Sequence, residues 1–300
     1  MNTNKKLTRR CLEGLRLAIS ISSSPDLARL GFGEMHLHDA FVELARYILA
    51  SGGSPAYGGD LRPNGYTELL FDLYKTYSEE VPGLPGLVHN YLSWPLSLRL
   101  DTTYRASLKG IVDFHEVPPP PDVKIDKTVF LPPDSLESRA IWARCLTEMR
   151  EKMTEECDGR VIIGGAVTGF LGCYPGIMEE AAITILKNKP LYIVGGLGGC
   201  SAAIASLILG SFPQEFKEDF QFGDEKYKMF VSEYNVLVDQ RKIFGKKIEW
   251  ETMTDFFKKV GISGLKNGLS EVENRRLFLS ENTHEIVSLI MNGLGRVRVC

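Results

Sequence analysis

The sequence lacks the marks of several protein classes. It has no Cys-x-x-Cys pair, and its 6 cysteines do not lie at zinc-finger spacing with its 5 histidines. Its longest apolar segment, residues 202–209, is far too short to span a bilayer. The polar, basic residues 1–6 are not followed by an apolar stretch with a small-residue cleavage site, so we expect no signal peptide. A formal net charge of -3 argues against a clustered basic face for a nucleic-acid backbone. We therefore expect a cytoplasmic protein that binds neither a membrane nor a nucleic acid.

What the sequence does contain is ordinary for a globular protein. Its residues are 44% hydrophobic and 24% charged. Its length of 300 residues is enough for one large domain or two modest ones. There is no repeat of solenoid length.

Three apolar runs each end in a glycine pair. The pairs are Gly58-Gly59, Gly164-Gly165 and Gly195-Gly196. A helical pattern follows each pair, and strands that alternate with helices indicate a parallel sheet with helices on both faces. The carboxyl ends of parallel strands line the ligand crevice of such sheets, so we expect the three glycine loops to meet at one edge.

The second of these units carries the strongest signal for a site. An apolar run at 161–163 ends in its glycine pair, and Pro175-Gly176 then opens a helix that carries Glu179 and Glu180. A strand, a glycine loop and a helix start present free backbone N–H groups to an anion. The two carboxylates would accept hydrogen bonds from ribose hydroxyls or act as an acid/base group. A carboxylate near a helix start is also expected from the helix dipole alone.

Polar side chains follow the first two predicted strands. The strand at 17–21 ends in Ser22 and Ser23, which are well placed for phosphate, although a simple serine-rich turn is the alternative. Asp60 and Arg62 follow the strand at 54–57. An arginine there would pair with phosphate and an aspartate with ribose, or the two would form a local surface ion pair.

A long helix is expected from a cap at Asp134 or Ser135 to about Cys157. Arg150 lies beside its apolar stripe, either as a surface residue with a buried stem or leaning over the pocket. From residue 212 onward glycines are sparser and aromatic residues denser. We therefore expect a nucleotide-binding domain at 1–210 and a helical extension at 211–300 that packs on it and could carry an oligomer interface.

The chain resembles the LSDAT branch of the SLOG superfamily in five segments. They are residues 56–62, 130–135, 147–153, 160–165 and 174–181. The resemblance implies a modified Rossmann-like α/β fold whose crevice binds nucleotides. Related domains occur in Thoeris anti-phage effectors, which sense cyclic ADP-ribose-type signals made from NAD, and in melastatin-type TRP channels, which use ADP-ribose. The LOG phosphoribohydrolases are more distant members.

The resemblance also implies roles for particular residues. Arg150 would contact the pyrophosphate and Glu180 the ribose, while the loops at Ser22, Gly59 and Gly165 would hold phosphate. The whole expected ligand-binding set is Ser20, Ser22, Ser23, Gly58, Gly59, Asp60, Arg62, Arg150, Gly164, Gly165, Tyr174, Pro175, Gly176, Glu179, Glu180, Gly195 and Gly196.

Two functions remain open. The first is a sensor of an NAD-derived or ADP-ribose-like nucleotide, a homo-oligomer acting through its C-terminal helices or with a separately encoded effector. The second is a nucleotide N-glycosidase in which Glu180 or Glu179 stabilises an oxocarbenium-like state and Tyr57 or Tyr174 assists proton transfer.

One departure from the LOG pattern bears on this choice. The LOG hydrolases carry Pro-Gly-Gly-x-Gly-Thr-x-x-Glu, whereas here Pro175-Gly176 leads directly to the bulky Ile177 and Met178. This weakens the hydrolase hypothesis and leaves the binding hypothesis standing.

We expect no cofactor and no metal. The pair His36 and His38, followed by Asp39, is the nearest approach to a metal motif. It lies at the entry to a helix, and no third ligand is evident.

Overall fold

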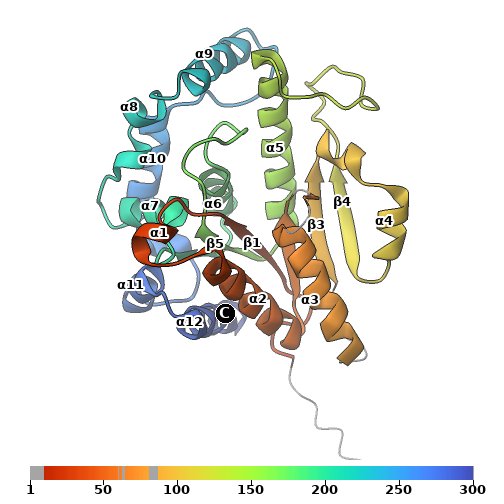
Figure 1. The fold of residues 1–300 in the computed structure, drawn as a ribbon. Helices are drawn as coiled ribbons and strands as arrows, with labels where there is room; N and C mark the ends of the chain where they lie inside the picture. Colours follow the sequence, from red (N-terminus) through yellow and green to blue (C-terminus); the bar gives the residue numbers. More distant parts are fainter. Residues whose placement is uncertain (1–9, 60, 63–64, 81–86, 300) are drawn as a thin grey trace, which may run out of the picture.

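The computed structural model describes residues 10–59, 61–62, 65–80 and 87–299. Its strands form one parallel sheet in the order β4–β3–β2–β1–β5–β6 (Figure 1). They are β1 (Arg16–Ser22), β2 (Ser54–Gly58), β3 (Val88–Ser93), β4 (Val112–Val117), β5 (Gly159–Gly164) and β6 (Leu191–Val194). The expected α/β, Rossmann-like fold with a helical C-terminal region is confirmed.

Helices cover both faces of the sheet. One face carries α2 (Glu34–Ala50), α3 (Tyr66–Glu80) and α12 (Thr283–Val299). The other carries α5 (Leu136–Glu156), α6 (Gly176–Leu186) and α7 (Gly199–Ile208). The faces divide because successive strand residues point to opposite sides: Val161 and Ile163 pack toward α2, and Ile162 packs toward α6.

Shorter helices and the C-terminal helices complete the chain. They are α1 (Leu27–Leu30), α4 (Thr102–Ser107), α8 (Glu218–Gln221), α9 (Glu225–Asp239), α10 (Trp250–Val260) and α11 (Glu271–Leu279). Ser270 Oγ accepts from the Glu273 N–H, while the Glu273 carboxylate accepts from the Ser270 N–H, and the two hydrogen bonds form a capping box at the start of α11.

The C-terminal helices share the hydrophobic core of the sheet. Ile286 and Ile290 of α12 belong to the cluster of Ile19, and Trp250 of α10 belongs to that of Ile162. Of these helices, α11 packs on β6 and α12 packs on α2, and the two helices lie next to each other in Figure 1. Among the described residues, no helix combines the length and the apolar composition needed to cross a membrane.

The strand order reverses at β1. It pairs with β2 on one side and with β5 on the other, so the connections leaving β1 and β5 diverge to opposite faces. In open parallel sheets, this point at the carboxyl ends of the strands is where ligands bind.

Candidate functional site

The loops that follow β1 and β5 meet at this edge. Ser22 lies opposite Gly164 in the sheet register. The N–H of Gly165 donates to the Ser22 carbonyl oxygen at 3.0 Å, and the N–H of Ala166 donates to Ser22 Oγ at 3.4 Å. The loop of the second glycine pair is therefore joined directly to the loop that follows β1.

The second glycine pair is required by close packing. Both residues have positive φ angles, 61° at Gly164 and 102° at Gly165. A Cβ atom on Gly164 would lie 2.8 Å from the Ser22 carbonyl oxygen, and one on Gly165 would lie 2.6 Å from Ile177 Cδ1. The glycines thus let β5 turn sharply toward the start of α6.

Arg150 reaches this helix start from α5. Its side chain is 10% exposed and pairs with Glu179, whose other oxygen accepts a hydrogen bond from Thr147 Oγ1. A Cβ atom on Gly172 or Gly176 would lie 2.9 Å from a guanidinium nitrogen of Arg150, so glycine at these positions gives the cation its space. Of the two expectations for Arg150, the surface position is wrong.

A second arginine lies deeper between α5 and α6. Arg160 of β5 is 1% exposed and donates to three hydroxyl groups, those of Ser20 at 2.6 Å, Thr154 at 2.9 Å and Thr184 at 2.9 Å. Glu180 lies 3.6 Å from its guanidinium. Ser20 therefore joins this arginine on the face of the sheet.

We call Arg150, Arg160, Glu179 and Glu180 the α5–α6 charge network. It balances two positive and two negative side chains, as buried charges require. Its two carboxylates differ. Glu179 accepts close hydrogen bonds at both oxygens, whereas Glu180 lies 3.6 Å and 3.9 Å from the arginine nitrogens, beyond hydrogen-bond distance. Buried Arg150 Nε also has no hydrogen-bond partner among the described residues.

The third glycine loop is covered by the protein itself. A Cβ atom on Gly195 would overlap the carbonyl oxygen of Phe278, and one on Gly196 that of Ser280. At the start of α7, the Gly199 N–H donates to Asp26 Oδ2 at 2.8 Å. The structure uses this loop to dock the C-terminal backbone and gives the helix start a carboxylate from within the chain.

The loop after β2 lies beside a small cavity. Gly58 packs against the sulfur atoms of Met149 and Met153. The cavity, of about 140 Å³, is lined by Leu61, Arg62, Thr67, Glu68 and Tyr104. Asp60 lies outside the described residues.

The two candidate tyrosines are placed differently. Tyr57 donates to the Ile21 carbonyl oxygen at 3.2 Å, near the carboxyl end of β1. Tyr174 instead exchanges hydrogen bonds with the Glu249 backbone, at 2.8 Å and 3.3 Å, and stands edge-on to Trp250. Burial raises the pKa of the Tyr174 phenol, which makes it a poor group for proton transfer near neutral pH.

The remaining candidates of the first strand and of α2 form local contacts. Ser23 donates to the carboxylate of Glu34. His36 Nδ1 accepts from the Gly33 N–H at 3.1 Å at the start of α2, and His38 stands edge-on to Tyr66.

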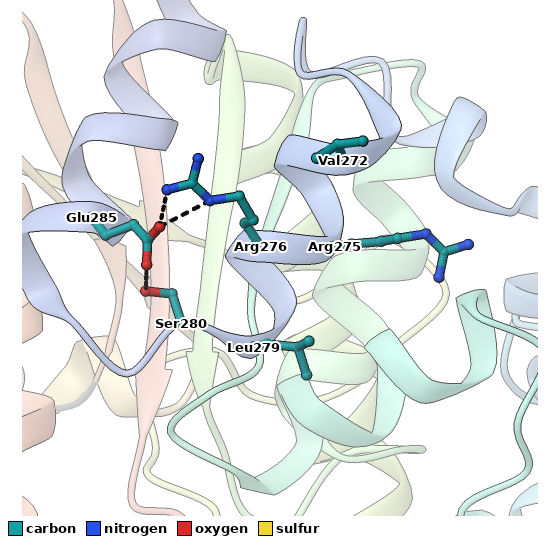
Figure 2. A pocket seen from close by; sticks show the side chains of 6 residues that line it. All are labelled: Val272, Arg275, Arg276, Leu279, Ser280 and Glu285. Carbon is teal, nitrogen blue, oxygen red and sulfur yellow. Dashed lines mark hydrogen bonds and ion pairs between the residues drawn. The ribbon is translucent and has the colours of Figure 1, made fainter.

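A larger cavity lies next to the third glycine loop, because one of its lining residues, Ser280, packs on Gly196 through its carbonyl oxygen. It measures about 360 Å³ and is formed by α11 and the start of α12 (Figure 2). In Figure 2, Arg276 reaches toward Glu285, which also accepts from Ser280 Oγ at 2.7 Å, while Arg275 extends away from them.

Comparisons with known proteins identify a family for this chain. A family model described as SLOG cluster2 matches residues 11–277. A similar solved structure is the X-ray structure of a structural-genomics target, TM1055, which is 16% identical; the match covers 67% of this chain and 86% of that one, with a TM-score of 0.38. No curated protein matches the chain.

Proposed function

The chain belongs to the SLOG cluster2 family, and from this premise we propose that it binds a nucleotide where β1 and β5 end and α6 begins. Family membership supports a nucleotide-related function. The observation that carries the location is Arg150 Nε, a buried donor without a hydrogen-bond partner among the described residues, next to the Glu180 carboxylate, which lies beyond hydrogen-bond distance of both arginines. A buried polar group without a partner is costly, and a ligand that supplies both an acceptor and a donor removes that cost.

We further propose that the ligand is an NAD-derived or ADP-ribose-like nucleotide. The diphosphate would accept from Arg150 and from the backbone N–H groups at the start of α6. Hydroxyls of a ribose would donate to Glu180, the carboxylate with remaining acceptor capacity. The protein would then act as a sensor, in anti-phage defence as a homo-oligomer or with a separate effector.

A route from this site to the C-terminal helices supports the sensor proposal. Tyr174 directly precedes Pro175, the cap residue of α6, and its hydroxyl binds the backbone of Glu249 at the start of α10. A ligand that moves the start of α6 would therefore move this hydrogen-bonded contact.

The second candidate is a nucleotide N-glycosidase, favoured by the same free acceptor capacity of Glu180. A buried carboxylate between two guanidinium groups could stabilise the positive charge that develops on the ribose ring as the glycosidic bond breaks.

One assay separates the two candidates. The protein is incubated with NAD, ADP-ribose, cyclic ADP-ribose isomers and nucleoside monophosphates, and products are followed by mass spectrometry together with the melting temperature. Unchanged ligand with a raised melting temperature supports the sensor, and release of a free base supports the glycosidase. Glu180→Gln should abolish turnover in a glycosidase and only weaken binding in a sensor. If none of these nucleotides binds or reacts, the proposal fails.

A further inference from the structure

A cluster of two histidines and an aspartate lies on β3 and β4, at some distance along the strands from the carboxyl edge. His89 pairs with Asp113 in the register of the two strands, and His115 follows two residues later on the same face. His89 also aligns through Ala56 with Ala18, near the amino end of β1. This cluster is thus separate from the nucleotide site.

Three donor atoms of the cluster converge on one point. His89 Nδ1 lies 3.0 Å from His115 Nε2, and Asp113 Oδ2 lies 3.3 Å from the former and 3.2 Å from the latter. A tetrahedral zinc ion held at 2.0–2.1 Å keeps its ligands about 3.3 Å apart. The three atoms therefore already form one face of a tetrahedral coordination shell.

The surrounding residues orient the His115 ring. Its other ring nitrogen, Nδ1, faces Glu156 Oε2 at 3.3 Å, and its ring stacks on Tyr91 with centroids 4.2 Å apart. Glu156 is itself held by the Tyr91 hydroxyl at 2.6 Å and by Lys152 at 2.7 Å. A proton on Nδ1 shared with Glu156 leaves the lone pair of Nε2 directed at the cluster, the usual support for a metal-bound histidine.

Hydrogen bonding alone does not account for all three contacts. Two imidazole N–H groups and an ionised carboxylate can form at most two hydrogen bonds among these three atoms, so in every tautomer one close contact joins two lone pairs or two N–H groups. A cation between them turns this repulsion into three favourable contacts.

We propose that His89, Asp113 and His115 bind one Zn²⁺ ion, with water in the fourth position. The donor set of two imidazoles and one carboxylate suits zinc. The side chain of Asp113 is 49% exposed, so an ion can enter from solvent, while His89 at 10% and His115 at 21% close the inner side. The ion would join the edge strand β4 to β3.

The test measures metal loading directly. Protein without a histidine tag is dialysed against ZnCl₂ with excess MgCl₂, and bound metals are quantified by elemental analysis. We expect one equivalent of zinc, a raised melting temperature, and loss of both in His115→Ala and Asp113→Asn. The matched control, a His36→Ala, His38→Ala double variant, should load as the wild type does.

A second measurement covers variants that fail to fold. Wild-type protein is titrated with Co²⁺, which gives an intense visible absorption when four-coordinate, and the band should disappear when zinc is added. Loading below one tenth of an equivalent, equal loading in the cluster variants, or an octahedral Co²⁺ spectrum would overturn the zinc site.

Discussion

The α5–α6 charge network and the ion pairs of the C-terminal helices use the same residue types in very different surroundings. The side chain of Arg160 is 1% exposed and that of its partner Glu180 is 9% exposed. On α11 and α12, the Arg296 and Glu273 side chains are 50% and 21% exposed. The charged atoms lie 3.6 Å apart in the buried pair and 2.7 Å apart in the exposed pair. The shorter distance alone would make the exposed pair the stronger one, whereas burial favours the other pair.

Burial decides which of these pairs matters more. Removing one partner of a buried pair leaves an uncompensated charge and costs about 3–5 kcal/mol, whereas an exposed pair contributes about 0–1 kcal/mol. Buried pairs are also no more stabilising than apolar residues of the same volume. A network of four buried charges between α5 and α6 therefore fits a functional requirement better than a need for stability.

The largest expected effect is that of Arg160→Met. The change leaves three hydroxyl groups without their donor and Glu180 without its nearer cation, so the free energy of unfolding should fall by about 3–5 kcal/mol. Urea unfolding followed by circular dichroism measures the loss. Arg29→Met is the matched control, because Arg29 is 72% exposed and pairs only across the surface with Asp26. Equal losses in the two variants would remove the contrast between buried and exposed charges.

Gly196→Ala tests how the C-terminal helices are joined to the sheet. The added methyl group would overlap the Ser280 carbonyl oxygen and push α11 and α12 away from the end of β6. Overpacking of this kind costs about 1–3 kcal/mol. Gly33→Ala is the control, since no atom lies within 4 Å of the added Cβ there. Hydrogen exchange should show faster exchange in α11 and α12 of Gly196→Ala alone; an unchanged pattern would mean that these helices do not depend on this contact.

Local pattern was enough to predict most of the fold. Strands and helices show in the periodicity of apolar residues, and the glycine pairs mark where strands end. The strand order could not be predicted in this way, because β1 and β5 are far apart in the sequence and no local pattern indicates that they are neighbours in the sheet. The division at residue 210 stays a prediction.

The site was only partly accessible from the sequence. The sequence points to Arg150, Glu179 and Glu180, but it includes Arg160 only as the first residue of the segment 160–165 that resembles the SLOG superfamily, although a charged residue beside Val161 is a usable signal. Its partner Ser20 lies 140 residues away, so the contact could not be inferred locally. Gly195 and Gly196 look like the other glycine pairs, yet a backbone segment far along the chain covers them.

Arg150→Lys sharpens the functional half of the comparison. Lysine keeps the charge but loses the planar guanidinium that binds Glu179 and that, in our proposal, would also bind the diphosphate. We expect about a tenfold weaker affinity, close to 1.4 kcal/mol, for whichever nucleotide binds in the assay proposed above, measured by calorimetry. Arg139→Lys is the control, because Arg139 on the same helix donates to the Phe170 carbonyl oxygen. Unchanged affinity in Arg150→Lys would place this arginine outside the binding site.

The smallest expected effect concerns the exposed pair and depends on pH. Donation by Arg296 and then by Ser270 lowers the pKa of Glu273 from 4.5 to about 2. A carboxyl group whose pKa is lower in the folded than in the unfolded protein stabilises the fold. The whole contribution is present at pH values above the ordinary pKa, and it is lost as the pH falls from about 5 toward 2. Glu273→Gln keeps the cap acceptor but removes the charge, so its melting temperature should lie slightly below that of the wild type at pH 7. The difference should narrow between pH 5 and pH 3, and it should be smaller at every pH in an Arg296→Gln background. A difference that stays constant with pH would show that water screens this pair completely, and the contrast with the α5–α6 charge network would then be larger still.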